Sequence, residues 1–320
     1  MPDFKKLSLR ECADRLLSVE KPLVLMHIRP DGDTVGSAAA LMEIFRELGR
    51  EPLYASADEI PERLAFLLDG SSRAESFEGL TPVGIDIPSP MQLGDLYGKL
   101  DVFFTIDHHE VNTPFSDNYT VGSASSAGEV LFDVLRVLVA DGKLTVTKRI
   151  AERIYAAISS DTGGFAYSNA SAKTYADAAE LVSFGIDHAD INRRLFASKS
   201  KSEIVANGIV GANLKTAADG KIAYATISRA ERENSSLAFS DFDTAIDVVR
   251  ALRGSEIAFV IKETDAGQFK ASLRSVGKNV AEIAARHSGG GHIRAAGCTI
   301  AAETVDGAAK ILLDEITAIL

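Results

Sequence analysis

Apolar and polar residues alternate along the first half of the chain in blocks that predict strands separated by helices. The predicted strands are short apolar runs rich in Val, Ile, Phe and Tyr, at residues 22–28, 51–56, 81–87 and 101–107. The predicted helices repeat apolar residues every three or four positions, at residues 36–49, 125–142 and 147–159. Alternation of this kind is typical of a mainly parallel sheet covered on both faces, so we expect an α/β domain.

The pattern changes after a polar stretch that lacks strand character. We predict that residues 1–187 form the first domain, 188–203 a linker and 204–320 a smaller α+β domain. In this second domain the expected strands are residues 221–228, 255–263 and 268–275, and the expected helices are residues 243–252 and 279–287. The fold class is therefore α/β followed by α+β, and we expect the active site in the cleft between the two domains.

Composition limits the classes of function. The 320 residues carry a net charge of −11, which argues against a long basic track for nucleic acid but allows a small phosphorylated ligand. No apolar run approaches the ~20 residues that cross a bilayer, and the N-terminus resembles an amphipathic helix rather than a secretion signal. The two cysteines are too few for a disulfide framework, so a reducing cytoplasm is expected. We expect no membrane partner; a homodimer stays open.

Metal-capable side chains end three of the predicted strands. His27, Asp86 and Asp107 each follow an apolar run. Because the carboxyl ends of parallel strands meet at one edge of a sheet, where ligands bind, these side chains are expected to converge there.

Two further acidic segments add carboxylates. Pro30 and Gly32 are expected to keep Asp31 and Asp33 on a loop, although Asp33 or its neighbour could instead cap the following helix. Asp161 follows a predicted helix and precedes two glycines, a pattern that is also typical of an ordinary turn.

Four carboxylates in one crevice repel one another and raise each other's pKa unless cations lie between them. Two divalent cations would balance the four charges. Mixed carboxylate and imidazole ligands favour Mn²⁺, with Mg²⁺, Co²⁺ or Zn²⁺ as alternatives. A pair of metals activates a bridging water and stabilises the leaving oxygen in phosphoester hydrolysis.

The motifs together resemble a known family. The segments HIRPDGDTVGS, VGID, IDHH and SSDTGGF, in this order, resemble the motifs of the DHH phosphoesterase superfamily. The later segments SLRS and GGGHIRAAG resemble its associated DHHA1 domain. Size and layout are similar to the nanoRNase/pAp phosphatase, NrnA-like, group.

The resemblance implies a role for each candidate residue. Two metal ions would be held by His27, Asp31, Asp33, Asp86, His108 and Asp161, with Asp86 between them. Catalysis would involve Asp33, His109 facing the scissile phosphate, and Asp107 orienting the histidines. Substrate phosphate would be bound by Arg274, Gly289, Gly290, Gly291 and His292.

The expected function is metal-dependent hydrolysis of short oligonucleotides, such as pApA or pGpG, to nucleoside 5′-monophosphates, and of 3′-phosphoadenosine 5′-phosphate (pAp) to AMP. A type II inorganic pyrophosphatase and a soluble cyclic-dinucleotide phosphodiesterase are the alternatives within phosphoester chemistry. A non-catalytic nucleotide-binding regulator is the alternative of another class.

Overall fold

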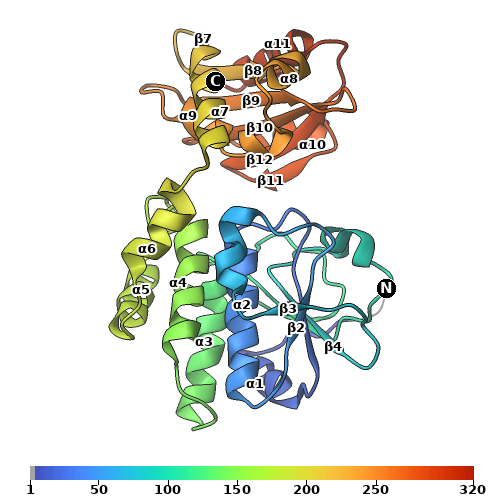
Figure 1. The fold of residues 1–320 in the computed structure, drawn as a ribbon, viewed down its shortest axis with the longest axis vertical. Helices are drawn as coiled ribbons and strands as arrows, with labels where there is room; N and C mark the ends of the chain where they lie inside the picture. The colour runs from blue at the N-terminus through green and yellow to red at the C-terminus, as the bar shows by residue number, and fades with distance from the viewer. Residues whose placement is uncertain (1–3) are drawn as a thin grey trace. The chain divides into compact units, whose positions relative to one another are not determined.

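The chain forms two compact units, each with its own sheet and core. A computed structural model describes residues 4–320, and the boundary between the units falls between Ser198 and Lys199. Figure 1 shows helices and a sheet in each unit. The mixed α/β class and the two-part architecture predicted from the sequence are confirmed.

The first unit contains six strands and six α-helices among its described residues. Its strands are β1 (Pro22–Leu25), β2 (Leu53–Ala55), β3 (Ser72–Arg73), β4 (Thr81–Ile85), β5 (Phe104–Asp107) and β6 (Asp117–Thr120). Its helices are α1 (Leu9–Ser18), α2 (Gly32–Glu47), α3 (Ala127–Ala140), α4 (Lys148–Asp161), α5 (Ala172–Ser183) and α6 (His188–Asn192). Short 3₁₀-helices are η1 (Glu62–Leu68) and η2 (Pro90–Leu96), and η3 (Arg193–Ala197) is a short π-helix.

The first sheet is parallel throughout, in the order β3-β2-β1-β4-β5-β6. The chain builds outward from β1 in one direction through β2 and β3, and in the other through β4, β5 and β6. The order therefore reverses between β1 and β4, and a sheet of this kind opens a crevice at the carboxyl ends of the two strands that flank the reversal.

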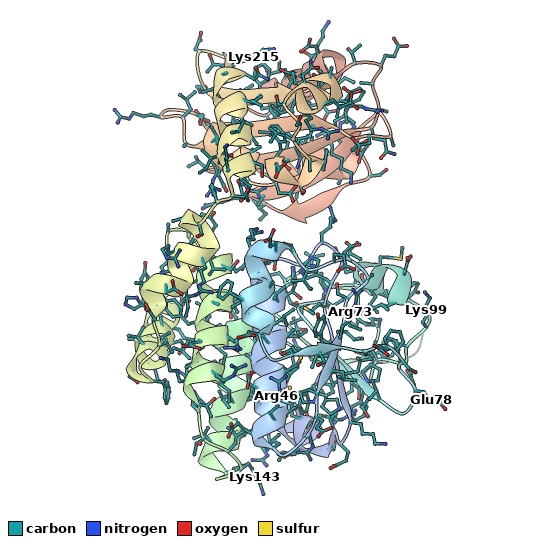
Figure 2. The ribbon with its side chains drawn as sticks, in the orientation of Figure 1. Arg46, Arg73, Glu78, Lys99, Lys143 and Lys215 are labelled. Carbon is teal, nitrogen blue, oxygen red and sulfur yellow. The ribbon has the colours of Figure 1, made fainter. Side chains whose placement is uncertain are left out.

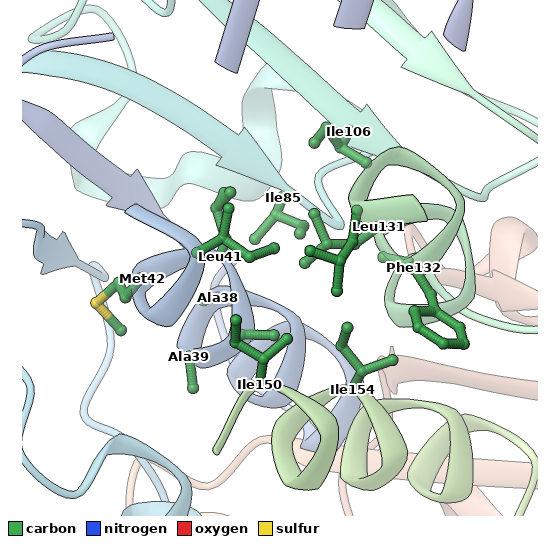
Figure 3. Close-up of a cluster of buried hydrophobic side chains, with 14 of the residues drawn as sticks. Ala38, Ala39, Leu41, Met42, Ile85, Ile106, Leu131, Phe132, Ile150 and Ile154 are labelled. Atoms are coloured by element: carbon green, nitrogen blue, oxygen red, sulfur yellow. The ribbon is translucent and has the colours of Figure 1, made fainter. Parts of the chain in front are cut away.

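Alternate strand residues pack on opposite faces of this sheet. Ile85 and Ile106 point to the face covered by α1, α2, α3 and α4, where the larger core lies (Figure 3). Leu23 and Leu25 point to the other face and pack against Leu93 of η2. Burial on both faces explains why the sequence of the central strand β1 is continuously apolar rather than alternating.

Helices α2 and α4 approach one another closely. A Cβ atom added to Gly36 of α2 would lie 2.9 Å from the backbone nitrogen of Ala157 in α4. Gly128 of α3 is similarly constrained, because its Cβ would lie 2.5 Å from the Ala157 Cβ. These glycines let three helices pack nearly backbone to backbone, which sets the positions of the polar residues at the helix ends.

The predicted linker at residues 188–203 is shorter in the structure. Residues 188–197 form α6 and η3 in the first unit, where Ile191 and Leu195 are buried in the larger core. The stretch is polar because only every fourth residue meets the core, so its composition resembles that of a linker.

The second unit is a mixed sheet with helices. Its strands are β7 (Lys215–Ala217), β8 (Ile222–Ile227), β9 (Ile257–Glu263), β10 (Phe269–Ser275), β11 (Gly290–His292) and β12 (Ala295–Ile300). Its helices are α7 (Lys201–Ala212), α8 (Arg229–Asn234), α9 (Ala245–Arg250), α10 (Val280–Arg286) and α11 (Val305–Thr317), with the short helix η4 (Phe239–Phe242). The sheet order is β11-β12-β10-β9-β8-β7, in which β8 and β9 are parallel and the other pairs antiparallel.

Charged side chains lie on the outside of each unit. Figure 2 shows Glu78, Lys99 and Lys143 on the first unit and Lys215 on the second, and all four are exposed. Among the described residues, the structure contains no helix with the length and apolar character that a membrane span requires.

Candidate metal centre

Polar side chains gather where β1, β4 and β5 end. His27 lies two residues beyond β1, Asp86 directly follows β4, and His108 directly follows β5. These strands are neighbours in the sheet, with β1 beside β4 and β4 beside β5. The topology therefore brings the three side chains to the crevice at the point where the strand order reverses.

The loop predicted to carry Asp31 and Asp33 is partly helix, and that prediction was wrong for Asp33. Helix α2 begins at Gly32, so Asp33 lies in its first turn. Asp31 is the N-cap, and its Oδ1 atom accepts hydrogen bonds from the backbone amides of Asp33 and Thr34, both at 3.0 Å. Pro30 precedes the cap and so does not interrupt the helix.

Asp33 is held by a second helix that the sequence did not reveal. Its carboxylate accepts hydrogen bonds from the backbone amides of Ala127 (2.7 Å) and Gly128 (3.2 Å) at the start of α3. The Ser37 hydroxyl donates a further bond of 2.9 Å. A helix N-terminus stabilises negative charge, so α3 fixes the orientation of a buried carboxylate. Only the small residues after Ser126 hint at this close contact.

Asp161 reaches the same place from the C-terminal end of α4. The predicted helix ended two residues earlier, but the observed one includes Asp161. The Asn169 amide donates to the Asp161 carbonyl at 3.1 Å and to its Oδ2 atom at 3.4 Å. Asn169 therefore positions the Asp161 carboxylate, a role that the sequence patterns did not predict.

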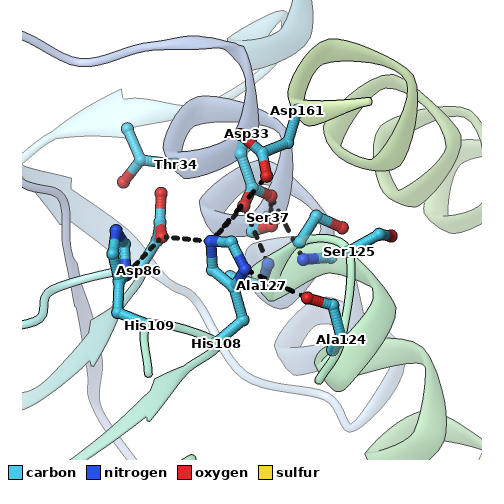
Figure 4. A network of polar contacts seen from close by, with 12 residues as sticks. Asp33, Thr34, Ser37, Asp86, His108, His109, Ala124, Ser125, Ala127 and Asp161 are labelled. Atoms are coloured by element: carbon cyan, nitrogen blue, oxygen red, sulfur yellow. Dashed lines mark hydrogen bonds and ion pairs between the residues drawn. The ribbon is translucent and has the colours of Figure 1, made fainter. Parts of the chain in front are cut away.

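The six predicted metal-binding residues lie around Asp86 (Figure 4 shows part of them). His27 and Asp31 form one group with Asp86, and Asp33, His108 and Asp161 form a second; a third group joins Asp86 and His108 with His109. In the first group, His27 Nε2 lies 3.5 Å from Asp86 Oδ2 and 3.8 Å from Asp31 Oδ1. In the second, His108 Nε2 lies 3.6 Å from Asp86 Oδ1, 3.6 Å from Asp33 Oδ2 and 4.0 Å from Asp161 Oδ2. The two oxygens of Asp86 therefore face different groups.

The backbone at Asp86 is unusual. Its φ angle of 60° lies in the left-handed region, which aspartate tolerates better than most residues. Its amide donates to the Ile106 carbonyl at 2.9 Å, which ties the turn to β5. Asp86 Oδ1 is buried without a hydrogen-bond donor. A buried carboxylate oxygen without a donor destabilises the folded protein unless a cation lies beside it.

The histidines expose one ring nitrogen to the carboxylates. His27 Nδ1 lies 2.7 Å from the Ile28 carbonyl, and His108 Nδ1 lies 3.3 Å from the Ala124 carbonyl. A carbonyl accepts from Nδ1–H, so in the neutral ring Nε2 carries the lone pair. Metal-binding histidines in proteins have this arrangement.

Asp107 supports the adjacent histidine pair. Its Oδ1 atom accepts from the His108 amide at 2.8 Å and lies 2.7 Å from His109 Nδ1. His109 Nδ1 also lies 3.6 Å from Asp86 Oδ1. The carboxylate of Asp107 thus orients both consecutive residues, and His109 remains half-buried at the edge of the cluster.

Without cations, protons must balance the charge of this cluster. Burial and the Asp86 carboxylate raise the pKa of Asp33 well above its ordinary value, and burial raises the pKa of Asp161 to about 7. Burial lowers the pKa of His108, but the carboxylates of Asp33 and Asp86 outweigh it and raise that pKa to about 9. Burial also lowers the pKa of His27, but the carboxylates of Asp31 and Asp86 outweigh it and hold that pKa well above its ordinary value.

These residues fit divalent metal ions. The donors are carboxylate oxygens and imidazole nitrogens, their charge is uncompensated, and one buried oxygen lacks a donor. Such a mixed set suits several first-row metals, so the chemistry of the donors does not select one.

The free energy of unfolding of the metal-free protein is expected to fall as the pH rises from about 4 to about 9. The pKa of Asp161 is raised from 3.8 to about 7, and that of His108 from 6.5 to about 9. The stability that each protonated form contributes is complete below the ordinary pKa and is lost as the pH rises through the raised value. Mn²⁺ would replace these protons and flatten the dependence. Thermal unfolding with EDTA or with Mn²⁺ measures this; a metal-free melting temperature that rises over the range contradicts it.

The candidate phosphate-binding residues lie together in the second unit. Arg274 of β10 is paired with Ala295 of β12, and its guanidinium donates to the Leu273 carbonyl at 2.9 Å. The segment Gly290–His292 forms β11, antiparallel to β12. The side chain of His292 lies outside the described part of the structure.

The three glycines differ in what they require. A Cβ on Gly289 would lie 2.2 Å from the Gly297 carbonyl oxygen, and one on Gly291 would lie 2.4 Å from the Ala295 carbonyl oxygen. Both glycines are therefore needed for close strand packing. Gly290 is exposed, with nothing within 4 Å of an added Cβ. Its lack of a side chain has no packing reason within the protein.

The fold and the converging carboxylates and imidazoles define a two-unit α/β protein with a candidate centre for divalent metal ions. Comparison with known families agrees with this class. The N-terminal domain of the DHH family matches residues 21–158, and the DHHA1 domain matches residues 219–318. The chain therefore contains a DHH-family N-terminal domain and a DHHA1 domain, as its motifs predicted.

Relatives cover nearly the whole chain. It is 29% identical over 309 residues to the bifunctional oligoribonuclease and PAP phosphatase NrnA of Bacillus subtilis, covering 94% of this chain and 95% of that protein. It is 28% identical to the protein of the same name from Thermus thermophilus, covering 96% and 93%. The fold is similar to that of an exopolyphosphatase-related protein from Bacteroides fragilis, with a TM-score of 0.87, 22% identity and coverage of 96% and 94%.

Proposed function

We propose that this protein is a metal-dependent phosphoesterase that hydrolyses short oligonucleotides to nucleoside 5′-monophosphates and pAp to AMP. The observation that carries the proposal is the convergence of four carboxylates, Asp86 among them, and two imidazoles at the point where the strand order reverses. The full-length similarity to proteins named oligoribonuclease and PAP phosphatase supports the substrate class.

Two divalent ions, which we propose to be Mn²⁺, would be held by the two groups of residues that share Asp86. The residues are His27 and Asp31 with Asp86 in one group, and Asp33, His108 and Asp161 with Asp86 in the other. Bound there, the ions would supply an activated water and neutralise the scissile phosphate. The amides of α3 would keep Asp33 in position during the reaction.

His109 is proposed to contact the scissile phosphate and to donate a hydrogen bond to the departing oxygen. Asp107 accepts from the His109 ring, which fixes the ring orientation and favours its protonated form. Burial lowers the pKa of His109, but the contacts with Asp107 and Asp86 outweigh it and raise that pKa, which suits a role as a proton donor.

The second unit is proposed to bind the terminal phosphate of the substrate through Arg274, Gly290 and His292. A guanidinium offers two parallel donors to phosphate oxygens, and a glycine without a packing reason leaves room for a ligand at the backbone. Recognition of one terminal phosphate selects short substrates. It also suits an acidic chain, because a long polymer would need a basic track.

Parallel assays of one preparation test this function. The substrates are pAp, pApA, pGpG, a five-residue RNA, a cyclic dinucleotide and inorganic pyrophosphate, each with Mn²⁺ and with EDTA. We expect Mn²⁺-dependent release of AMP from pAp and pApA. Cleavage of pyrophosphate alone would instead identify a pyrophosphatase, and cleavage of the cyclic dinucleotide alone a cyclic-dinucleotide phosphodiesterase. Tight nucleotide binding without turnover would identify a regulator.

Substitutions at the second unit should affect substrate binding more than turnover. We expect His292→Ala and Gly290→Ala to raise KM by about tenfold while kcat changes little, because both remove ground-state contacts. Gly290→Ala should leave the melting temperature unchanged, whereas Gly291→Ala should lower it through the overlap with the Ala295 carbonyl. Steady-state kinetics and thermal unfolding measure the two effects. If KM were unchanged in both His292→Ala and Gly290→Ala, these residues would not bind the substrate phosphate.

The state of the two cysteines bears on the location of the protein. The thiols of Cys12 and Cys298 are free and buried, which fits a reducing compartment, so we propose a cytoplasmic enzyme. Its proposed partners are short oligonucleotides and nucleotides.

A further inference from the structure

A polar pocket lies beside the metal centre in the first unit. It has a volume of about 490 Å³ and is lined in part by His109, Asn112, Asn118, Thr120, Ser123 and Lys6. His109 is the residue shared between this pocket and the metal centre, since its ring also lies 3.6 Å from Asp86 Oδ1. A ligand in the pocket would therefore touch the residue proposed to contact the scissile phosphate.

The pocket wall combines side chains that form hydrogen bonds with neutral polar ligands and one carboxylate, that of Glu110. The Asn112 amide donates to the His109 carbonyl at 3.4 Å, which ties this side chain to the catalytic segment. The Thr120 hydroxyl donates to the side-chain Oδ1 atom of Asn118 at 3.3 Å. This bond orients the Asn118 amide, which is largely buried. Two amides and two hydroxyls match the edges of a base and the hydroxyls of a ribose.

The rim of the pocket adds two different chemistries. The N-terminal segment contributes Phe4, a ring on which a base can stack, and Lys6, an exposed cation. Lys6 is fixed in place because its backbone bridges to Asn118 of β6. The volume lies within the ~300–1,000 Å³ of small-molecule sites and is large enough for a nucleoside.

The proposed reaction requires a place for one particular nucleoside. When a linear oligonucleotide yields nucleoside 5′-monophosphates, water adds to phosphorus and the bond from phosphorus to the 3′ oxygen breaks. The 3′ oxygen leaves with a proton. The phosphate stays on the 5′ oxygen of the following nucleoside, which must therefore sit next to the metal centre on the side away from the terminal phosphate.

We propose that the pocket beside His109 binds this following nucleoside, the one that keeps the scissile phosphate. The inference rests on the proposed function and adds a substrate subsite to it. It also separates the two proposed substrates. A dinucleotide has a nucleoside in this position, whereas in pAp the scissile 3′-phosphate carries no second nucleoside. The pocket should then contribute to binding of pApA but not of pAp.

The test compares the two substrates in variants of the pocket. Ser123→Trp places a large ring in the pocket from an exposed position, and Lys6→Ala removes the cation at the rim. Lys5→Ala is the matched control. Lys5 precedes Lys6 and carries the same charge, but it does not line the pocket. The measurement is kcat/KM for pApA divided by kcat/KM for pAp, together with the melting temperature of each variant.

We expect the ratio to fall by about tenfold or more in Ser123→Trp and by about threefold in Lys6→Ala, and to stay at the wild-type value in Lys5→Ala. A ratio that is unchanged in both pocket variants, or an equal loss on both substrates, overturns the subsite. If Ser123→Trp does not fold, Lys6→Ala alone decides. Failure of the proposed function is distinguishable, because the wild-type protein would then hydrolyse neither substrate.

Discussion

Replacing Asp86 with asparagine should lower kcat/KM for pAp and pApA by about 10³-fold or more, equivalent to about 4 kcal/mol of transition-state stabilisation. Asp86 is the residue that both groups of candidate metal ligands share, so its loss weakens both at once. Asparagine also tolerates a left-handed backbone, so the φ angle of 60° can be kept. Initial rates at saturating Mn²⁺ measure the loss.

The stability of the same variant separates loss of metal binding from misfolding. In the metal-free protein, Asp86→Asn removes one charge from a crowded set of carboxylates, so its melting temperature should equal or exceed that of the wild type. Added Mn²⁺ should stabilise the wild type but not the variant. Asp101→Asn, at an exposed carboxylate outside the site, is the control and should behave as wild type. Full activity of Asp86→Asn would rule out a shared ligand.

Replacing Gly36 with valine should destabilise the first unit by about 3 kcal/mol. The Cβ atom alone would lie 2.9 Å from the Ala157 nitrogen and 3.0 Å from the Arg153 carbonyl oxygen. Both are backbone atoms of α4, so the helices must move apart. Because Asp33 lies in the first turn of α2 and Asp161 ends α4, the same movement should reduce activity even in the folded fraction. Urea unfolding and activity at low temperature measure the two effects.

Gly208→Val is the matched control for this substitution. Gly208 lies in α7, is exposed, and has nothing within 4 Å of an added Cβ. The change should alter stability by no more than about 0.5 kcal/mol, because valine and glycine differ little in helix propensity. If both variants lost equal stability, the loss in Gly36→Val could not be assigned to the close packing of α2 and α4.

Helix ends provide the precision of the candidate centre. Asp31 caps α2, the α3 amides hold Asp33, and Asp161 closes α4. Backbone groups at helix ends move little because the helices are packed through glycine contacts. A carboxylate oriented by backbone amides needs little reorganisation when a cation binds, which favours a preformed site.

The local sequence by itself predicted strands β1, β2, β4, β5, β8, β9 and β10 and several helices, but not β3, β6, β7, β11 and β12. Apolar runs specify buried parallel strands, and a polar residue at the end of such a run must lie at the sheet edge. For this reason the sequence predicts that His27, Asp86 and Asp107 meet in one crevice, whereas the metal-binding role of His108 was implied by the family resemblance. Asp33 was misplaced because the start of α2 depends on two hydrogen bonds to one side-chain oxygen of Asp31, which the apolar pattern does not reveal.

Only the tertiary structure decided which groups surround each ligand. The contact between Asp33 and the α3 amides joins residues that are more than ninety positions apart, and no local pattern encodes such a distance. The polar residues 188–197 belong to the first unit because Ile191 and Leu195 meet its core, although composition indicated a linker. The pocket beside His109 forms only when the N-terminal segment lies along β6. Hydrophobic periodicity thus specifies elements and their faces, whereas pairings between distant elements depend on how those faces pack.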